Sequence, residues 1–369
     1  MTSLPQNDLS PDNLLAQALE KFHLSHPEIE SIEISTVRGT RLRLPEANQA
    51  APSIVQVKPV NKTYAQPHTS AADLIQLLQS RGLSVENPAT AAEWIEKVGY
   101  YRLKGYGLHF RIRNAHGILS EDYQIGTTFA SITGLSEFDR HLRLLVLDAI
   151  ERIEVAFRSR VNEILASRHG SHWFMDPLRF NDKKDKNTGH LIFNHGDFIT
   201  KTLDEALRNK ESLSIRHYFA TYSDPALPPC WMLGEVLSMG NWSKIFGMLA
   251  DRSDQKPVAD AFHASVPELT SWMHALTNLR NTCAHHSRLW DRRFNTCPSM
   301  KGNLKSVIDS NDRLFAQIAT VIYCLQSVEP ESRWLEKLTN LIHDTPSIDL
   351  APMGFPNDWL PRLQSIKHR

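Results

Sequence analysis

Apolar residues recur at helical spacing through most of the chain after residue 67. The longest pattern runs from about Ser136 to Ile164 and forms one broad apolar stripe. A helix that is apolar over so much of its circumference is expected to be central or shared with a second subunit. Shorter helical patterns cover residues 70–81, 88–98, 230–239, a segment from about 258, 271–279, 305–328 and 332–342. The sequence therefore predicts an all-α protein.

The first 63 residues follow a different pattern. Residues 11–22 fit one helix, and the partial alternation over 32–44 predicts a small β-hairpin. Residues 45–67 contain four prolines and little periodicity, which is typical of a linker. We expect an N-terminal extension with a proline-containing linker at 1–63, a helical domain at 64–360 and a C-terminal tail at 361–369, without a convincing run of strands after residue 67.

Two local expectations concern the helical domain. Residues 230–239 predict a helix that stops at Gly240, with Asn241 or Ser243 capping the helix that follows. The charged run at 181–186 is typical of a solvated loop.

Composition limits the class of protein. Lys plus Arg and Asp plus Glu both total 41, so the net charge favours neither nucleic acid nor an anionic membrane, and any basic surface has to be local. The four cysteines lie far apart without a CxxC pair or a secretory signal, which indicates reduced thiols in the cytoplasm. The longest apolar runs are far shorter than the roughly 20 residues of a membrane span. We expect a soluble cytoplasmic protein that makes no membrane contact.

One polar cluster stands at the end of the apolar segment 271–279. It contains Arg280, Asn281, His285 and His286. Histidine transfers protons near neutrality, a guanidinium matches two phosphate oxygens, and an amide can orient either group. Because RNA carries its own nucleophile, the 2′-hydroxyl, these groups can cut it in principle without a metal.

The same segment is locally basic. From Arg280 to Lys305 there are six Lys or Arg residues and one acid, Asp291. This charge would attract a nucleic-acid backbone.

The spacing of Arg280 and His285 presents a geometric difficulty. On an ideal helix, positions i and i+5 point about 140° apart, so the two side chains do not face the same way. Either the helix is irregular here, or a two-fold axis brings two copies of each residue together. His286 is the alternative second proton carrier within one chain.

Other interpretations of these residues remain open. Cys283 and Cys297 could join the two histidines in a zinc site, but the spacing matches no usual pattern. A second RxxxxH string runs from Arg111 to His116, in what reads as an exposed turn. Composition alone fits a site and a polar helix end equally well.

Glu154 and Arg158 on the long helix are a further candidate pair. They stand at i and i+4 in the favourable order, so a surface ion pair explains them without any function. Structural support of the site by these residues is the alternative.

Several strings in order resemble a known family. The segment from Leu279 to Trp290, LRNTCAHHSRLW, looks like the signature of the Abi abortive-infection family, of the AbiD and AbiF type, in the HEPN superfamily. The other matching segments are GYYRLKGY at 99–106, FDRHLR at 138–143, ERIEVAFR at 151–158, PPCWMLGEVLSMG at 228–240 and MGFP at 353–356. The resemblance covers residues 64–360.

The resemblance implies an all-helical HEPN-like bundle and bacterial defence against phage. In the HEPN superfamily, the Arg and His of RxxxxH form a metal-independent endoribonuclease site, commonly at a dimer interface. Carried over, these are Arg280 and His285 as catalytic residues with Asn281 as the polar neighbour, while His286 and Arg288 would support them. Some similar proteins are toxins restrained by a small RNA or a protein antitoxin.

We therefore expect a homodimeric endoribonuclease that uses no cofactor and leaves a 2′,3′-cyclic phosphate. Two alternatives use the same basic patch. One is a non-catalytic module that binds RNA or a partner, and the other is an antitoxin-like protein that neutralises a neighbouring enzyme.

Overall fold

The computed structural model of the chain contains two compact units, Met1–His68 and Thr69–Arg369. The structure describes residues 33–35, 41–43, 67–114, 117–184, 188–189, 191–208 and 212–366. In the first unit, β1 (Glu33–Ser35) pairs antiparallel with β2 (Arg41–Arg43), which confirms the predicted hairpin. The helix predicted at 11–22 and nearly all of the linker lie outside the described residues.

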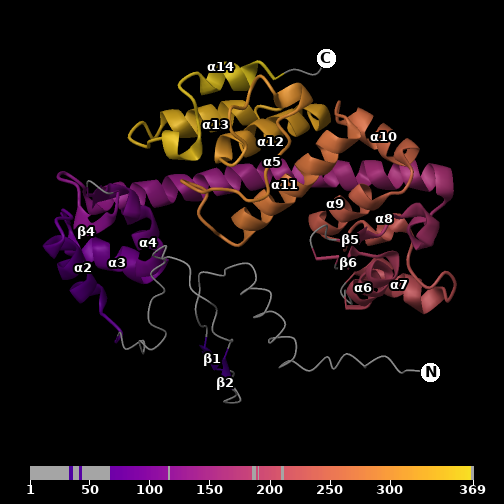
Figure 1. Ribbon diagram of the computed structural model, residues 1–369, viewed down its shortest axis with the longest axis horizontal. Coiled ribbons are helices and arrows are strands. Elements are labelled where there is room, and N and C mark those ends of the chain that lie inside the picture. Colours follow the sequence, from indigo (N-terminus) through magenta and orange to yellow (C-terminus); the bar gives the residue numbers. More distant parts are fainter. Residues whose placement is uncertain are drawn as a thin grey trace, which may run out of the picture. The chain divides into compact units, whose positions relative to one another are not determined.

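The second unit is built from helices, which confirms the all-α prediction (Figure 1). Its α-helices in the described residues are α2 (Ala71–Ser80), α3 (Pro88–Val98), α4 (Tyr100–Gly107), α5 (Phe129–His169), α6 (His195–Arg208), α7 (Leu213–Thr221), α8 (Cys230–Leu233), α9 (Met239–Met248), α10 (Arg252–Ala261), α11 (Val266–Ala284), α12 (Leu314–Val328), α13 (Trp334–His343) and α14 (Trp359–Gln364). The predicted starts and stops hold for α2 and α3, where Ser70 and Asn87 accept hydrogen bonds from the first-turn backbone.

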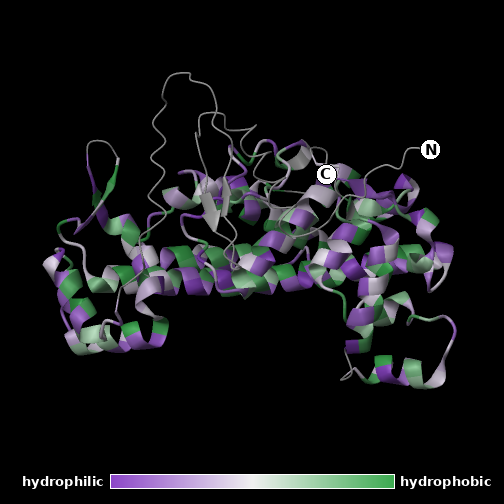
Figure 2. Ribbon diagram, turned by 60° about the horizontal axis from the view of Figure 1, so that its bottom comes forward, coloured by the Kyte–Doolittle hydropathy of each residue, from purple (hydrophilic) through white to green (hydrophobic). Residues whose placement is uncertain are grey.

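The long predicted helix is α5, the axis of this unit. Figure 1 shows α2, α3 and α4 at one end of it and α8 and α9 toward the other, and α11 and α12 pack against its middle. Figure 2 shows hydrophobic and hydrophilic residues interleaved along its length. The helix is longer than predicted at both ends, because the Thr128 side chain caps its start and Gly170, at φ 86°, ends it.

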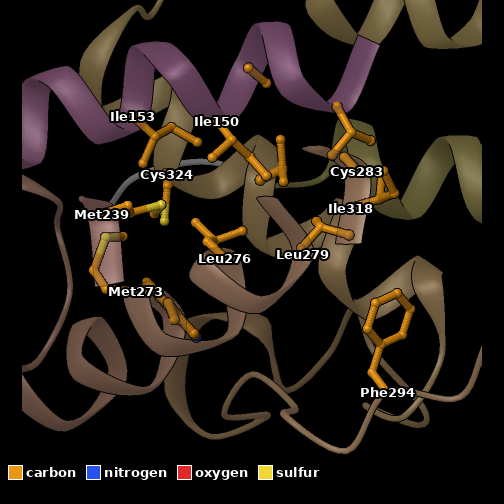
Figure 3. Packing of buried hydrophobic residues seen from close by; sticks show 14 of the residues in the cluster. Ile150, Ile153, Met239, Met273, Leu276, Leu279, Cys283, Phe294, Ile318 and Cys324 are labelled. Atoms are coloured by element: carbon orange, nitrogen blue, oxygen red, sulfur yellow. The ribbon is translucent and has the colours of Figure 1, made fainter. Parts of the chain in front are cut away.

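The core beneath α5 fixes the position of the polar cluster. Figure 3 shows Leu276, Leu279 and Cys283 of α11 packed against Ile150 and Ile153 of α5. Each of these side chains is at most 1% exposed. Burying a side chain such as Leu contributes about 1.5–3 kcal/mol, so the last turns of α11 are held firmly against α5.

Some predicted boundaries were wrong. Gly240 does not stop a helix: α8 ends at Leu233, and α9 begins at Met239 with Ser238 as its cap, in place of Asn241 or Ser243. Gly240 lies in the first turn of α9, where an added Cβ would meet Thr277 of α11 at 3.4 Å. This distance is at the limit of ordinary van der Waals contact, so α9 and α11 pack against each other here without requiring a glycine.

Two short hairpins occur among the described residues after residue 67, within the helical domain. The strand β3 (Arg111–Arg113) pairs with β4 (Leu119–Tyr123), and β5 (Lys183–Lys184) pairs with β6 (Leu191–Phe193), both antiparallel. Part of the charged run at 181–186 is thus an exposed strand. Within the described ranges, no helix is both long enough and apolar enough to cross a lipid bilayer.

Candidate active site

The polar cluster lies where α11 ends. The helix begins with a reciprocal capping box between Ser265 and Glu268 and ends at Ala284, so His285 is its C-cap. The Ser287 backbone N–H donates to the Thr282 carbonyl at 2.9 Å, which closes a Schellman turn. The helix is therefore interrupted inside the motif, and ideal-helix geometry does not fix the direction of His285.

His286 occupies the left-handed position of this turn, with φ at 56°. Glycine is the usual residue there, because a Cβ in this conformation costs roughly 1–2 kcal/mol. The backbone thus holds an imidazole where a simple helix stop would favour glycine.

Arg280 and His285 both reach solvent. The Arg280 side chain is 42% exposed, with Nε 3.8 Å from Glu154 Oε2 and Nη1 3.5 Å from Asn281 Oδ1. Asn281 and His285 are exposed. Long contacts of this kind hold the guanidinium weakly, so it can turn toward a ligand at small cost.

Glu154 and Arg158 do not form the predicted ion pair with each other. Arg158 Nη2 instead contacts both carboxylate oxygens of Glu235, at 3.0 and 3.1 Å, and Glu154 contacts Arg280. The Glu154 carboxylate also accepts the Met239 backbone N–H, and burial raises its pKa although Arg280 and Arg158 lower it. Glu154 therefore connects α5 to both α9 and α11.

A second carboxylate of α5, Asp139, organises the segment after the motif. Its side chain is fully buried, and its Oδ1 accepts the backbone N–H groups of Leu289 at 3.0 Å and Trp290 at 2.7 Å. Its Oδ2 accepts the Tyr106 hydroxyl at 2.7 Å and a guanidinium N–H of Arg143. We call these five residues the Asp139 cluster.

The Asp139 cluster joins three of the sequence motifs. Tyr106 comes from the aromatic motif on α4, Asp139 and Arg143 come from α5, and Leu289 follows the RxxxxH string. Burial and the nearby Asp139 charge raise the pKa of Tyr106 to about 12, so its hydroxyl remains a donor. Arg288 adds a bond from its guanidinium to the Gly105 carbonyl, an anchoring contact in this structure.

A hollow of about 530 Å³ lies beside the turn and is rich in cations. We call it the basic hollow, and its lining residues are Lys97, Val98, Arg102, Ser136, Glu137, Arg140, Arg143, Leu144, Leu147, Cys283 and His286. Glu137 is the single acid in this lining. Among the described residues, neither Lys97 nor Arg102 has an acidic partner within ion-pair distance.

The basic residues predicted between Arg280 and Lys305 are largely engaged elsewhere. Arg288 bonds to Gly105, Arg293 pairs with Asp312 at 2.5 Å, and Arg292 lies over the Phe294 ring at 5.9 Å. The concentrated positive charge beside the turn therefore comes mainly from α3, α4 and α5.

The structure does not support the zinc site, and Arg111 of the second RxxxxH string is a buried side chain that forms an ion pair. Burial raises the pKa of the Cys283 thiol to about 12, and no set of three or more His, Cys, Asp or Glu side chains in the described ranges could hold a metal ion. Arg111 is buried and pairs with Glu121 at 3.1 Å, so it is not in the exposed turn that we expected. His116 lies outside the described residues.

Sequence reasoning missed the Asp139 cluster and the basic hollow. The sequence contained one signal for the Asp139 cluster. Asp139 and Arg143 stand at i and i+4 inside the apolar stripe of α5, where a solvated ion pair is not expected. Lys97 gave no such signal, because its proximity to the turn depends on how α3 and α4 pack.

Comparison with known proteins places this chain in a family. A family model described as Abi-like protein matches residues 93–291, more than half of the chain. The match includes α5, the Asp139 cluster, the basic hollow and the whole turn at the end of α11. No curated protein sequence and no solved structure matches the chain.

Proposed function

This chain belongs to the Abi-like protein family, and on that premise we propose that it is an abortive-infection endoribonuclease of the HEPN type. The family associates it with abortive infection, a bacterial defence against phage. The proposed reaction is metal-independent cleavage of RNA, with Arg280 and His285 as catalytic residues.

The observation that carries this proposal is the exposure of both groups at the end of one rigid helix. His285 is exposed, and the Arg280 guanidinium is partly exposed and only weakly paired. The core residues behind them are almost fully buried, so the helix end is fixed while the two side chains are free to meet a substrate.

The chemistry follows from these groups. The RNA 2′-oxygen attacks the adjacent phosphorus while a neutral imidazole accepts the 2′-hydroxyl proton. The bond from phosphorus to the 5′-oxygen breaks, and an imidazolium donates a proton to that oxygen. A 2′,3′-cyclic phosphate and a 5′-hydroxyl result, and Arg280 stabilises the charge on the phosphorane.

The reaction needs two proton carriers. A symmetric dimer would supply a His285 from each copy, whereas His286 would serve within one chain. Mixed dimers of wild-type and His285→Ala protomers test the shared site. If each copy supplies one proton carrier, the mixed dimer should be as inactive as the His285→Ala protein, and about half of the wild-type rate in a demonstrated mixed dimer contradicts the shared site.

The direct test is cleavage of labelled RNA in the presence of a chelator. We expect Arg280→Ala and His285→Ala each to reduce the rate by about 100-fold or more. Arg216→Ala and His217→Ala are matched controls, because both residues are exposed on α7. A 2′-deoxy nucleotide at the cleavage position should block the reaction, and full activity in both motif variants would end the catalytic assignment.

A non-catalytic role gives different results. A module that only binds RNA or a partner would keep its RNA affinity in His285→Ala and would cleave at no pH. An antitoxin-like protein would leave growth unchanged when expressed alone, whereas the proposed nuclease should arrest growth in a manner that depends on His285.

A further inference from the structure

We propose that the basic hollow is the subsite that holds the backbone of single-stranded RNA next to the reacting phosphate. This proposal rests on the ribonuclease function above and adds the residues that bind the strand, Lys97 on α3 and Arg102 on α4. Arg140 and Arg143 on α5 complete the basic wall.

The charge balance of the hollow favours an anion. Four cations face one acid, Glu137, whose carboxylate is 3.8 Å from Arg140. Arg143 is held by the buried Asp139, which fixes one guanidinium in the wall. In the described part of the chain Lys97 and Arg102 lack acidic partners, so two cations remain for a ligand. Because the chain has zero net charge, this positive charge is a local property of the hollow.

The lining also suits a strand better than a free anion. Val98, Leu144 and Leu147 lie among the cations, and Leu144 is 52% exposed. Single-stranded nucleic acid presents phosphates together with the apolar faces of bases, which matches a wall of both kinds. The volume of about 530 Å³ lies inside the usual range of binding sites, about 300–1,000 Å³.

The hollow is next to the proposed catalytic groups. His286, which follows His285, lines it, and so does Cys283 on the last turn of α11. Arg280 lies four residues before the end of α11 at Ala284, a helix rise of roughly 6 Å, and His286 follows in the turn. A short stretch of one strand can therefore occupy the hollow while its neighbouring phosphate meets Arg280.

This position predicts an effect on binding that is separate from the chemical step. Phosphate contacts away from the reacting bond lower KM and leave kcat nearly unchanged, because they are equally strong before and during the reaction. They are also sensitive to salt: each lost phosphate contact reduces the slope of log affinity against log salt by about 0.7 for a single strand.

The experiment measures binding of a labelled single-stranded RNA in the His285→Ala protein, with and without Lys97→Ala and Arg102→Ala together. We expect about tenfold weaker binding at moderate salt and a slope that is smaller by about 1.4. The matched control is Lys183→Ala with Lys184→Ala, which removes two exposed lysines from β5. Circular dichroism establishes that each variant is folded.

Other phosphate-containing ligands show whether the hollow prefers a nucleic-acid strand, a nucleotide or an anionic lipid surface. Single-stranded DNA should lose affinity in the same way, because the contacts are to phosphates. ATP and vesicles rich in anionic lipid should bind weakly, and their binding should not depend on Lys97 or Arg102. Tight, Lys97-dependent binding of ATP or of vesicles would overturn the strand assignment.

The outcomes for this subsite and for the nuclease are distinguishable. A salt-dependent loss in the hollow variant without any cleavage by wild type supports the subsite while the nuclease function fails. Cleavage that depends on His285 but keeps the same KM and salt slope in the hollow variant overturns the subsite and leaves the nuclease standing.

Discussion

Asp139 and Glu154 are carboxylates on the same helix, α5, and both contact the chain at or just after the end of α11. Asp139 is fully buried and accepts hydrogen bonds from two backbone groups, a tyrosine and an arginine. The Glu154 side chain remains 16% exposed, and its pairing distance to Arg280 is 3.8 Å. The first contact fixes backbone, whereas the second leaves a side chain adjustable.

Asp139 therefore stabilises the backbone, whereas Glu154 leaves the Arg280 side chain able to move. A buried carboxylate with several donors is costly to disturb, because removal of one partner leaves the others unpaired. A loosely paired surface guanidinium can exchange its partner for a phosphate. Asp139 therefore fixes the position of the turn. Glu154 keeps Arg280 near the turn but pairs with it only weakly.

The largest expected effect comes from removing the buried acid. Asp139→Ala should lower the free energy of unfolding by about 3–5 kcal/mol, since it leaves Arg143 buried without its partner. Chemical denaturation measures this change. Asp148→Ala, at a 44% exposed acid paired with Arg152, should cost less than about 1 kcal/mol. Equal losses in the two variants would contradict the comparison.

A smaller effect of opposite sign is expected at the turn between the two acids. His286→Gly should raise the free energy of unfolding by about 0.5–1 kcal/mol, because relief of the left-handed strain exceeds the added entropy of the unfolded chain. His263→Gly is the matched control, since His263 also has a positive φ of 50°. Both variants should be stabilised in thermal melts, but only His286→Gly should weaken RNA binding. A destabilised His286→Gly protein would show that imidazole contacts outweigh the strain.

The smallest effect is expected at Glu154 and depends on pH. Burial raises the pKa of this acid, so the folded chain binds its proton more tightly than the unfolded chain does. The contribution to stability therefore falls as pH rises from the ordinary range of glutamate through the raised pKa. Glu154→Gln should remove this dependence and change stability by less than about 1 kcal/mol at neutral pH.

Denaturation across acidic to neutral pH measures the Glu154 effect. Glu235→Gln is the control, because the Glu235 side chain is 70% exposed and its substitution should leave the pH profile unchanged. If the stability of Glu154→Gln rises less than that of wild type as pH increases through the acidic range, the Arg280 pairing dominates burial.

Local signals along the sequence predicted some helices closely but missed α6 and α7. Helical periodicity predicted α2 and α3 to within a residue. The prediction failed where tertiary packing overrides local signals: glycine is typical of a helix stop, but Gly240 lies in the first turn of α9, which packs against α11. Residues 305–313 precede α12, which begins at Leu314 and not at Lys305 as predicted.

The candidate site could be predicted only in part for the same reason. The string from Arg280 to His286 is contiguous, so its chemistry was visible in the sequence. The partners of Glu154 and Arg158 are Arg280 and Glu235, which lie far away along the chain, and helical spacing contains no information about them. The basic hollow depends in the same way on how α3, α4, α5 and α11 meet.

The bonds made by Asp139 have a consequence for cooperativity. One carboxylate links α4, α5 and the segment after the turn, and its partner Arg143 is also in the wall of the basic hollow. Local opening that separates α4 from α5 would therefore disrupt the wall of the basic hollow and release the histidine turn in the same event. In the proposed nuclease, strand binding and proton transfer would then be lost together.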